Sequence, residues 1–200
     1  MKKSSLLLVV IGSIIGVIVF FALIFFLYYK GIYNKELKLN QQVKQQWANV
    51  ESSYQRRADL IPNLVNTVKG YADFEKETLT RVIEARAKAT SVNINSDNLT
   101  PEKFQQFQQA QDGLSSALSR LMVVVERYPE LKANQNFLEL QAQLEGTENR
   151  INVERSRYNE TVGNYNSFAL RFVVQMLFNY EEKPYFHAQE GAEVAPSVEF

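Results

Sequence analysis

The sequence predicts an all-α protein, in which an N-terminal transmembrane helix leads into an elongated antiparallel bundle of three long helices and a short irregular C-terminal tail. Three observations support this class. The segment 6–29 is apolar and carries no charge. From residue 43 onward, apolar residues recur at alternating steps of three and four, the spacing of a helix that buries one face. No segment sustains the alternation of a β-strand. The predicted parts are a flank at 1–5, the span at 6–29, the bundle at 30–180 and the tail at 181–200.

The segment 6–29 is long enough to cross a lipid bilayer. At about 1.5 Å per residue it reaches roughly 36 Å, against a hydrocarbon core of about 30 Å. Tyr28 and Tyr29 end it, and their rings favour the headgroup region. A cleaved signal peptide is the alternative, but its apolar part is normally shorter and precedes small residues. We therefore expect an uncleaved single-pass anchor. Basic residues nearly balance across it, so both orientations stay open.

The first bundle helix carries the apolar series that starts at Val43 and reaches Val82. Pro62 lies inside this series, and a proline removes one backbone hydrogen bond and usually kinks or ends a helix. The apolar residues nevertheless keep their phase on both sides of it. We therefore expect one helix, kinked at Pro62 but continuous, that stops in the polar run 91–98. Two helices meeting at Pro62, four bundle helices in all, are the alternative.

Two further helices complete the predicted bundle. Thr100 and Pro101 have the pattern of an N-cap and a first helical position, and the helix they begin is expected to end near Tyr128. The third helix starts near Glu130 or Asn136 and runs to Phe178. Because the chain would then travel away from the membrane, back, and away again, we expect the tail to lie far from the membrane.

Composition excludes several classes of function. The chain has no cysteine and one histidine, so thiolate nucleophiles, disulfides and cysteine or histidine metal clusters are ruled out. With 22 basic and 22 acidic residues it lacks the positive surplus of a nucleic-acid-binding protein. No Gly-rich phosphate loop or activated nucleophile is present. We expect no enzymatic activity, no metal, no cofactor and no small-molecule substrate.

Several short motifs lie along the predicted helices: Trp47–Val50, Gln55–Val65, Val68–Ala72, Tyr128–Asn134, Leu144–Ile151 and Tyr158–Glu160. Together they resemble the LemA family of single-pass bacterial membrane proteins, over most of residues 6–178. The resemblance implies a membrane-anchored helical bundle, and we expect it in the bacterial inner membrane. It implies no reaction, because the biochemical role of that family is unsettled.

Charged residues on the buried faces are candidate interhelical contacts. Arg57 falls on or beside the apolar face of its helix, where a charge needs a partner. We interpret it as part of a set of ion pairs that fix the register of the helices, an anion site held by arginine being the alternative. The candidate residues are Arg56, Arg57, Asp59, Glu75, Glu148, Arg150 and Glu154.

Tyr158 and Tyr165 lie one heptad apart, and each is followed by asparagine. A tyrosine on a buried face packs its ring and can bond its hydroxyl to a neighbouring helix. We interpret both as packing residues, with ligand recognition as the alternative.

The tail keeps large apolar residues, among them Val198 and Phe200. A solvated spacer normally lacks such groups, so we expect a contact element. Folding back on the bundle or on a neighbouring subunit is one possibility. Binding of the terminal strand to a partner, in the manner of PDZ recognition, is the other.

Together these features favour a non-enzymatic scaffold or adaptor of the bacterial envelope. Its expected partners are the bilayer, through residues 6–29, and either further copies of itself or other envelope proteins. The alternative is a transport or stress-response component that binds lipid or protein between its helices.

Overall fold

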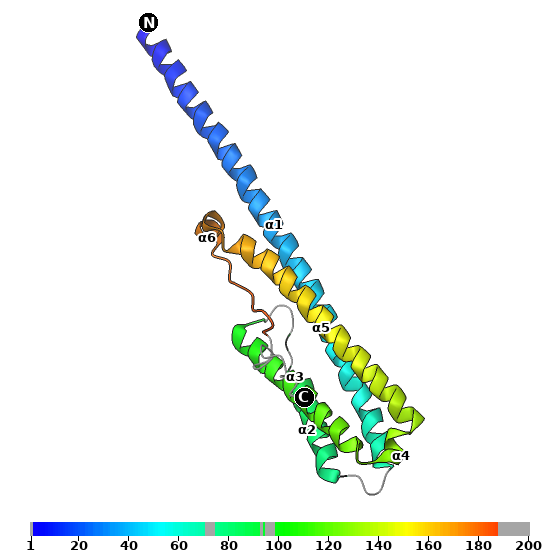
Figure 1. The fold of residues 1–200 in the computed structure, drawn as a ribbon. Helices are drawn as coiled ribbons and strands as arrows, with labels where there is room; N and C mark the ends of the chain where they lie inside the picture. The colour runs from blue at the N-terminus through cyan, green and yellow to red at the C-terminus, as the bar shows by residue number, and fades with distance from the viewer. Residues whose placement is uncertain (1, 71–74, 93, 95–98, 188–200) are drawn as a thin grey trace, which may run out of the picture.

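The computed structural model describes residues 2–70, 75–92, 94 and 99–187, with side chains from residue 8 onward. The protein is all-α, and no strand occurs in the described residues. Its helices are α1 (Lys2–Lys69), α2 (Lys76–Ser91), α3 (Pro101–Val125), α4 (Pro129–Lys132), α5 (Gln135–Ala169) and α6 (Phe172–Phe178). Figure 1 shows α5 lying along α1, the pair α2 and α3 beside them, and the N-terminal half of α1 extending alone beyond the bundle.

Helix α1 joins the apolar segment directly to the bundle. Its side chains are exposed from Leu8 to Tyr29, and this is the one described stretch long and apolar enough to cross a membrane. Beyond residue 30 the same helix enters the core. Because no loop intervenes, the direction of the apolar segment sets the direction of the bundle.

Pro62 lies inside α1, which confirms the prediction that the helix passes through it. A proline has no N–H for the carbonyl four residues before it. In this protein that carbonyl belongs to Ala58, and it accepts a hydrogen bond of 2.8 Å from Nε of Arg86 on α2. A side chain from the neighbouring helix thus replaces the bond that Pro62 cannot make.

The prediction that the first bundle helix continues to residue 90 is wrong. Helix α1 ends at Lys69, next to Gly70, and α2 begins at Lys76. Glycine is a poor helix former, so a helix readily ends beside it, and α2 packs against α3 instead of continuing α1. Helix α2 then returns alongside α3 (Figure 1).

Helix α3 agrees with its prediction. The Thr100 side chain caps it by accepting from the backbone N–H of Lys103. Its buried face carries Phe104, Phe107, Leu114, Leu118, Leu121 and Val125.

The third predicted helix is also divided. Helix α5 ends at Ala169 and α6 follows after two residues. The amide of Gln175 donates to the carbonyls of Ala169 (2.9 Å) and Tyr180 (2.7 Å), so it holds α6 against the end of α5. Asn179, in the left-handed conformation with φ 48°, ends α6.

The expectation that the tail lies far from the membrane is wrong for its described part, residues 181–187, which begins beside the apolar segment. The extra reversal after α1 inverts the direction of α5, which returns toward the apolar segment (Figure 1). The ring of Phe178 lies 4.6 Å from that of Tyr29. From there residues 181–187 run back along the bundle.

The core has three parts along the rod. The distal part surrounds Leu64, Leu121 and Phe137. The middle part surrounds Trp47, Tyr158 and Phe186. The third part, nearest the apolar segment, contains Ile32, Phe168 and Val174. Polar side chains occupy the boundary between the distal and middle parts, and they form the candidate site.

Candidate functional site

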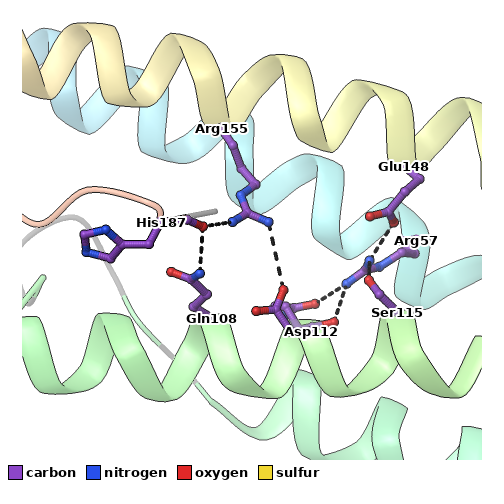
Figure 2. Close-up of polar contacts among 8 residues, drawn as sticks. Arg57, Gln108, Asp112, Ser115, Glu148, Arg155 and His187 are labelled. Atoms are coloured by element: carbon purple, nitrogen blue, oxygen red, sulfur yellow. Dashed lines mark hydrogen bonds and ion pairs between the residues drawn. The ribbon is translucent and has the colours of Figure 1, made fainter. Parts of the chain in front are cut away.

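Arg57 lies at the boundary between the distal and middle core and is 1% exposed. Helix α1 places it opposite α3 and α5. Its Nη1 donates to Ser115 Oγ and to Glu148 Oε2, both at 2.7 Å. Its Nη2 donates to Gln111 Oε1 at 2.8 Å and to the Gln111 carbonyl at 3.2 Å. One guanidinium therefore ties three helices together (Figure 2).

The surroundings of Arg57 neutralise its charge internally. The carboxylate of Glu148 meets it, and the ring of Tyr54 lies 5.1 Å from the guanidinium carbon. Burial raises the pKa of Tyr54 to about 12, against the opposing positive charges of Arg155 and Arg57, so this hydroxyl stays protonated. Because shifting either helix would separate the buried charge of Arg57 from the carboxylate of Glu148, the contact suits a register-fixing ion pair.

A hollow of about 330 Å³ borders the same contact, lined by Arg57, Ser115, Gln141 and Glu148 among others. The Glu148 side chain is 42% exposed, so it reaches water from this hollow. An external anion would have to displace Glu148 to reach the guanidinium. The geometry therefore favours the internal ion pair over an anion site.

Glu154 forms a second buried polar contact, between α5 and α1. It is 3% exposed, and its Oε2 accepts from Gln46 Nε2 at 2.8 Å. On its own helix, Arg157 lies 3.2 Å and Arg150 3.8 Å from its Oε1.

Residues 183–187, here called the strap, form an extended segment that two asparagines hold. Asn166 accepts from the N–H of Lys183 and donates to its carbonyl, both at 2.9 Å. Asn159 does the same for Phe186, at 2.8 and 2.9 Å. Each amide thus satisfies both backbone groups of one strap residue, as a neighbouring β-strand would.

The tyrosines that precede these asparagines point into the core. Tyr158 is 0% and Tyr165 4% exposed. Burial raises the pKa of Tyr158 above its usual range, and burial together with the negative charge of Glu36 raises that of Tyr165 to about 12. Consecutive helical residues are turned by about 100°, so the tyrosine packs inward while the next residue faces the strap.

The end of the strap is fixed by Phe186 and by the carbonyl of His187. The carbonyl accepts from Gln108 Nε2 at 3.0 Å and from Arg155 at 2.9 Å (Figure 2). Arg155 also lies 3.9 Å from Asp112 and 4.8 Å from the centre of the Phe186 ring. The imidazole of His187 is itself exposed.

The remaining candidates lie apart from Arg57. Arg56 is exposed, and Asp59 accepts from Gln55 on the helix surface. Glu75 pairs with Arg127 at 2.7 Å, where both side chains are largely exposed. Val198 and Phe200 lie outside the described residues. The described residues contain no group of three or more acidic or histidine side chains that could hold a metal.

Sequence reasoning missed Gln111, Ser115, Asn159 and Asn166. The repeated asparagine after each tyrosine was a usable signal, because a polar residue at heptad spacing marks one face of a helix. Gln111 and Ser115 lie one turn apart on α3 but carry no charge, so nothing in their residue types pointed to a guanidinium.

Comparison with known proteins places this chain among a small group of relatives. The profile described as the LemA family matches residues 46–200. Protein LemA of Metamycoplasma hominis is 24% identical over 153 residues, which cover 75% of this chain and 66% of that protein. Magnetosome protein MamQ of Magnetospirillum gryphiswaldense is 22% identical over 183 residues, 80% of this chain and 66% of that protein. Magnetosome protein MamQ 2 of Paramagnetospirillum magneticum is 25% identical over 153 residues, 67% of this chain and 56% of that protein. The chain thus spans just under two thirds, or less, of these relatives.

Proposed function

The chain belongs to the LemA family, and on that basis we propose that it is a membrane-anchored, non-enzymatic scaffold of the bacterial envelope. In this proposal the apolar part of α1 spans the inner membrane once. The bundle presents its helical surface to further copies of itself or to other envelope proteins.

The continuity of α1 is the observation that carries the proposal. One helix runs from the apolar segment to the far end of the bundle. A hinge would let the bundle swing, whereas a continuous helix holds it at a set distance and direction from the membrane. Such rigidity suits a protein that positions other proteins.

The filled interior favours the outer surface as the place for partners. Buried side chains occupy the space between the helices in all three parts of the core, and the charge of Arg57 is paired with Glu148 of the same chain. The outer surface, in contrast, contains an open groove. A groove of about 730 Å³ lies between α2 and α3, with Ala117 and Val124 in its lining and Arg81 and Arg120 among its charged groups.

Photo-crosslinking in living cells tests the proposal. The crosslinking amino acid would replace Val123, which lines the groove and is 71% exposed, or Val153, which lies on α5 and is 47% exposed. We expect crosslinked products with protein partners or with a second copy from at least one position. Protein that is in the membrane fraction yet crosslinks to nothing from either position would contradict the scaffold role.

A further inference from the structure

The segment 170–176 exposes large apolar side chains beside the bundle. Phe172 is 80%, Met176 70%, Leu170 51% and Val173 41% exposed. On its other side, Val174 is buried against Ile32 and Phe168. Helix α6 is therefore held firmly by one face while the opposite face has no cover within the described part of the chain.

This apolar face lies level with the end of the membrane-spanning part of α1. The exposed stretch from Leu8 to Tyr29 would extend about 33 Å as a helix, which matches a hydrocarbon core of about 30 Å. Its last residues reach α6. The ring of Tyr29 contacts that of Phe178, and Leu27 and Tyr28 line a hollow of about 510 Å³ together with Phe172 and Val173.

Two basic side chains lie at the same level. Lys35 and Arg171 both line this hollow, and each lies within 6 Å of the Phe168 ring, at 5.2 and 5.9 Å. Neither forms an ion pair with a residue that the structure describes. Basic side chains at the end of a membrane span are attracted to lipid phosphates.

We propose that α6 is a second membrane contact, which rests on the proposed membrane anchor. Its apolar face, Phe172, Val173 and Met176, inserts into the interfacial layer of the bilayer that α1 spans, together with Leu170, which precedes the helix. Lys35 and Arg171 lie at the lipid phosphates. Attachment at two points, the span and α6, fixes both the tilt of the bundle and its rotation about α1.

The bilayer is the occupant that the surroundings favour. The apolar face is continuous with the lipid-facing surface of α1 at Leu27 and Tyr28. Exposed aromatic and aliphatic side chains at the end of a membrane span, with basic residues beside them, suit the interfacial layer of a bilayer.

Site-specific fluorescence in liposomes tests this proposal. The chain has no cysteine, so single cysteines can be introduced and labelled with an environment-sensitive dye. The test position is Met176→Cys. Phe20→Cys within the span and Val123→Cys at the distal bundle, 59% and 71% exposed, are the controls. The full chain is reconstituted in equal parts of phosphatidylcholine and phosphatidylglycerol, and quenching by spin-labelled lipid is compared with quenching by iodide.

We expect the Met176→Cys label to be quenched by spin-labelled lipid and to be severalfold less accessible to iodide than the Val123→Cys label. If Phe20→Cys is lipid-quenched but Met176→Cys behaves like Val123→Cys, the α6 contact is wrong and the anchor stands. If Phe20→Cys is not lipid-quenched, the anchor itself is wrong. Protection of Met176→Cys from both quenchers would mean that protein covers it, and it would overturn the proposal.

The basic residues have a separate test. Arg171→Glu should increase iodide access to the Met176→Cys label severalfold in the same liposomes. Arg120→Glu, an exposed change on distal α3, should leave it unchanged. Equal effects of the two substitutions would overturn the role of Arg171.

Discussion

Replacing Phe186 by alanine should show how much the strap contributes to the bundle. Phe186 is 5% exposed, and its ring centre lies 4.6 Å from that of Phe104, 5.4 Å from Tyr158 and 6.2 Å from Trp47. Removing a core phenylalanine typically costs about 3–5 kcal/mol. The loss of stability has an upper limit, because the strap of the variant can detach from the bundle and regain conformational entropy. The loss therefore cannot exceed the net free energy with which the strap binds the bundle. We therefore expect Phe186→Ala to lower the free energy of unfolding by about 3 kcal/mol.

Trp47 is a suitable reporter for this change. It is the sole tryptophan, is 1% exposed and is stacked on Phe186. Urea unfolding of the full chain in mild detergent, followed by tryptophan emission, gives the free energy of unfolding. We also expect the emission of the folded variant to shift to the red, because water reaches the indole once the ring is gone.

Phe172→Ala is the matched control, since Phe172 is 80% exposed. It should change the free energy of unfolding in detergent by no more than about 0.5 kcal/mol. If Phe186→Ala also stays within about 1 kcal/mol of the unsubstituted protein, with unchanged emission, the strap does not cover Trp47 as described and the reasoning fails.

Three further predictions concern polar contacts. Glu148→Gln should lower the free energy of unfolding by about 2 kcal/mol, because buried Arg57 loses its carboxylate partner. Arg57→Met should lower it by less, because the unpaired Glu148 carboxylate already reaches water. Urea unfolding of both variants checks this order, and the reverse order would contradict it. Pro62→Ala should raise stability by up to about 3 kcal/mol. Arg86→Met should lower the free energy of unfolding by about 1 kcal/mol. The loss should be smaller in a protein that also carries Pro62→Ala, because the new N–H at position 62 can bond the same Ala58 carbonyl. A double-mutant cycle that finds no coupling between the two substitutions would refute this. Finally, stability should fall between about pH 10 and 12, because the pKa of Tyr54 rises from about 10 in the unfolded chain to about 12 when buried. The folded state keeps this proton longer, so the stabilisation is complete below pH 10 and is lost above it. Unfolding midpoints measured alongside tyrosinate absorbance check the trend, and a midpoint that does not change with pH would argue against it.

Local patterns accounted for those parts of the fold that depend on one helix alone. The start of α3 at Pro101 followed from Thr100 and Pro101, because a cap needs only residues within one turn. The passage of α1 through Pro62 followed from the unbroken phase of its apolar residues. Arg57 stood out for a similar reason, as a charge on an apolar face.

Other features depend on residues far apart in the sequence. The carbonyl that Pro62 leaves without a partner is bonded by Arg86 from α2, and no spacing within α1 reveals that partner. The course of the strap likewise depends on residues far apart in the sequence. Asn159 and Asn166 fit a solvated helix face equally well until an extended segment is placed against them.

The sequence by itself determined the helical class, the apolar span and the faces that each helix buries, because periodicity and charge are local properties of the chain. The tertiary structure alone decided where the chain reverses, and through that the direction of α5, the position of α6 beside the span and the course of the strap. The physical reason lies at Gly70. A helix that continues past it and a helix that ends there differ little in local energy, so packing α2 against α3 decides between them. That one reversal inverts every later element, and it brings α6 back beside the end of the apolar segment.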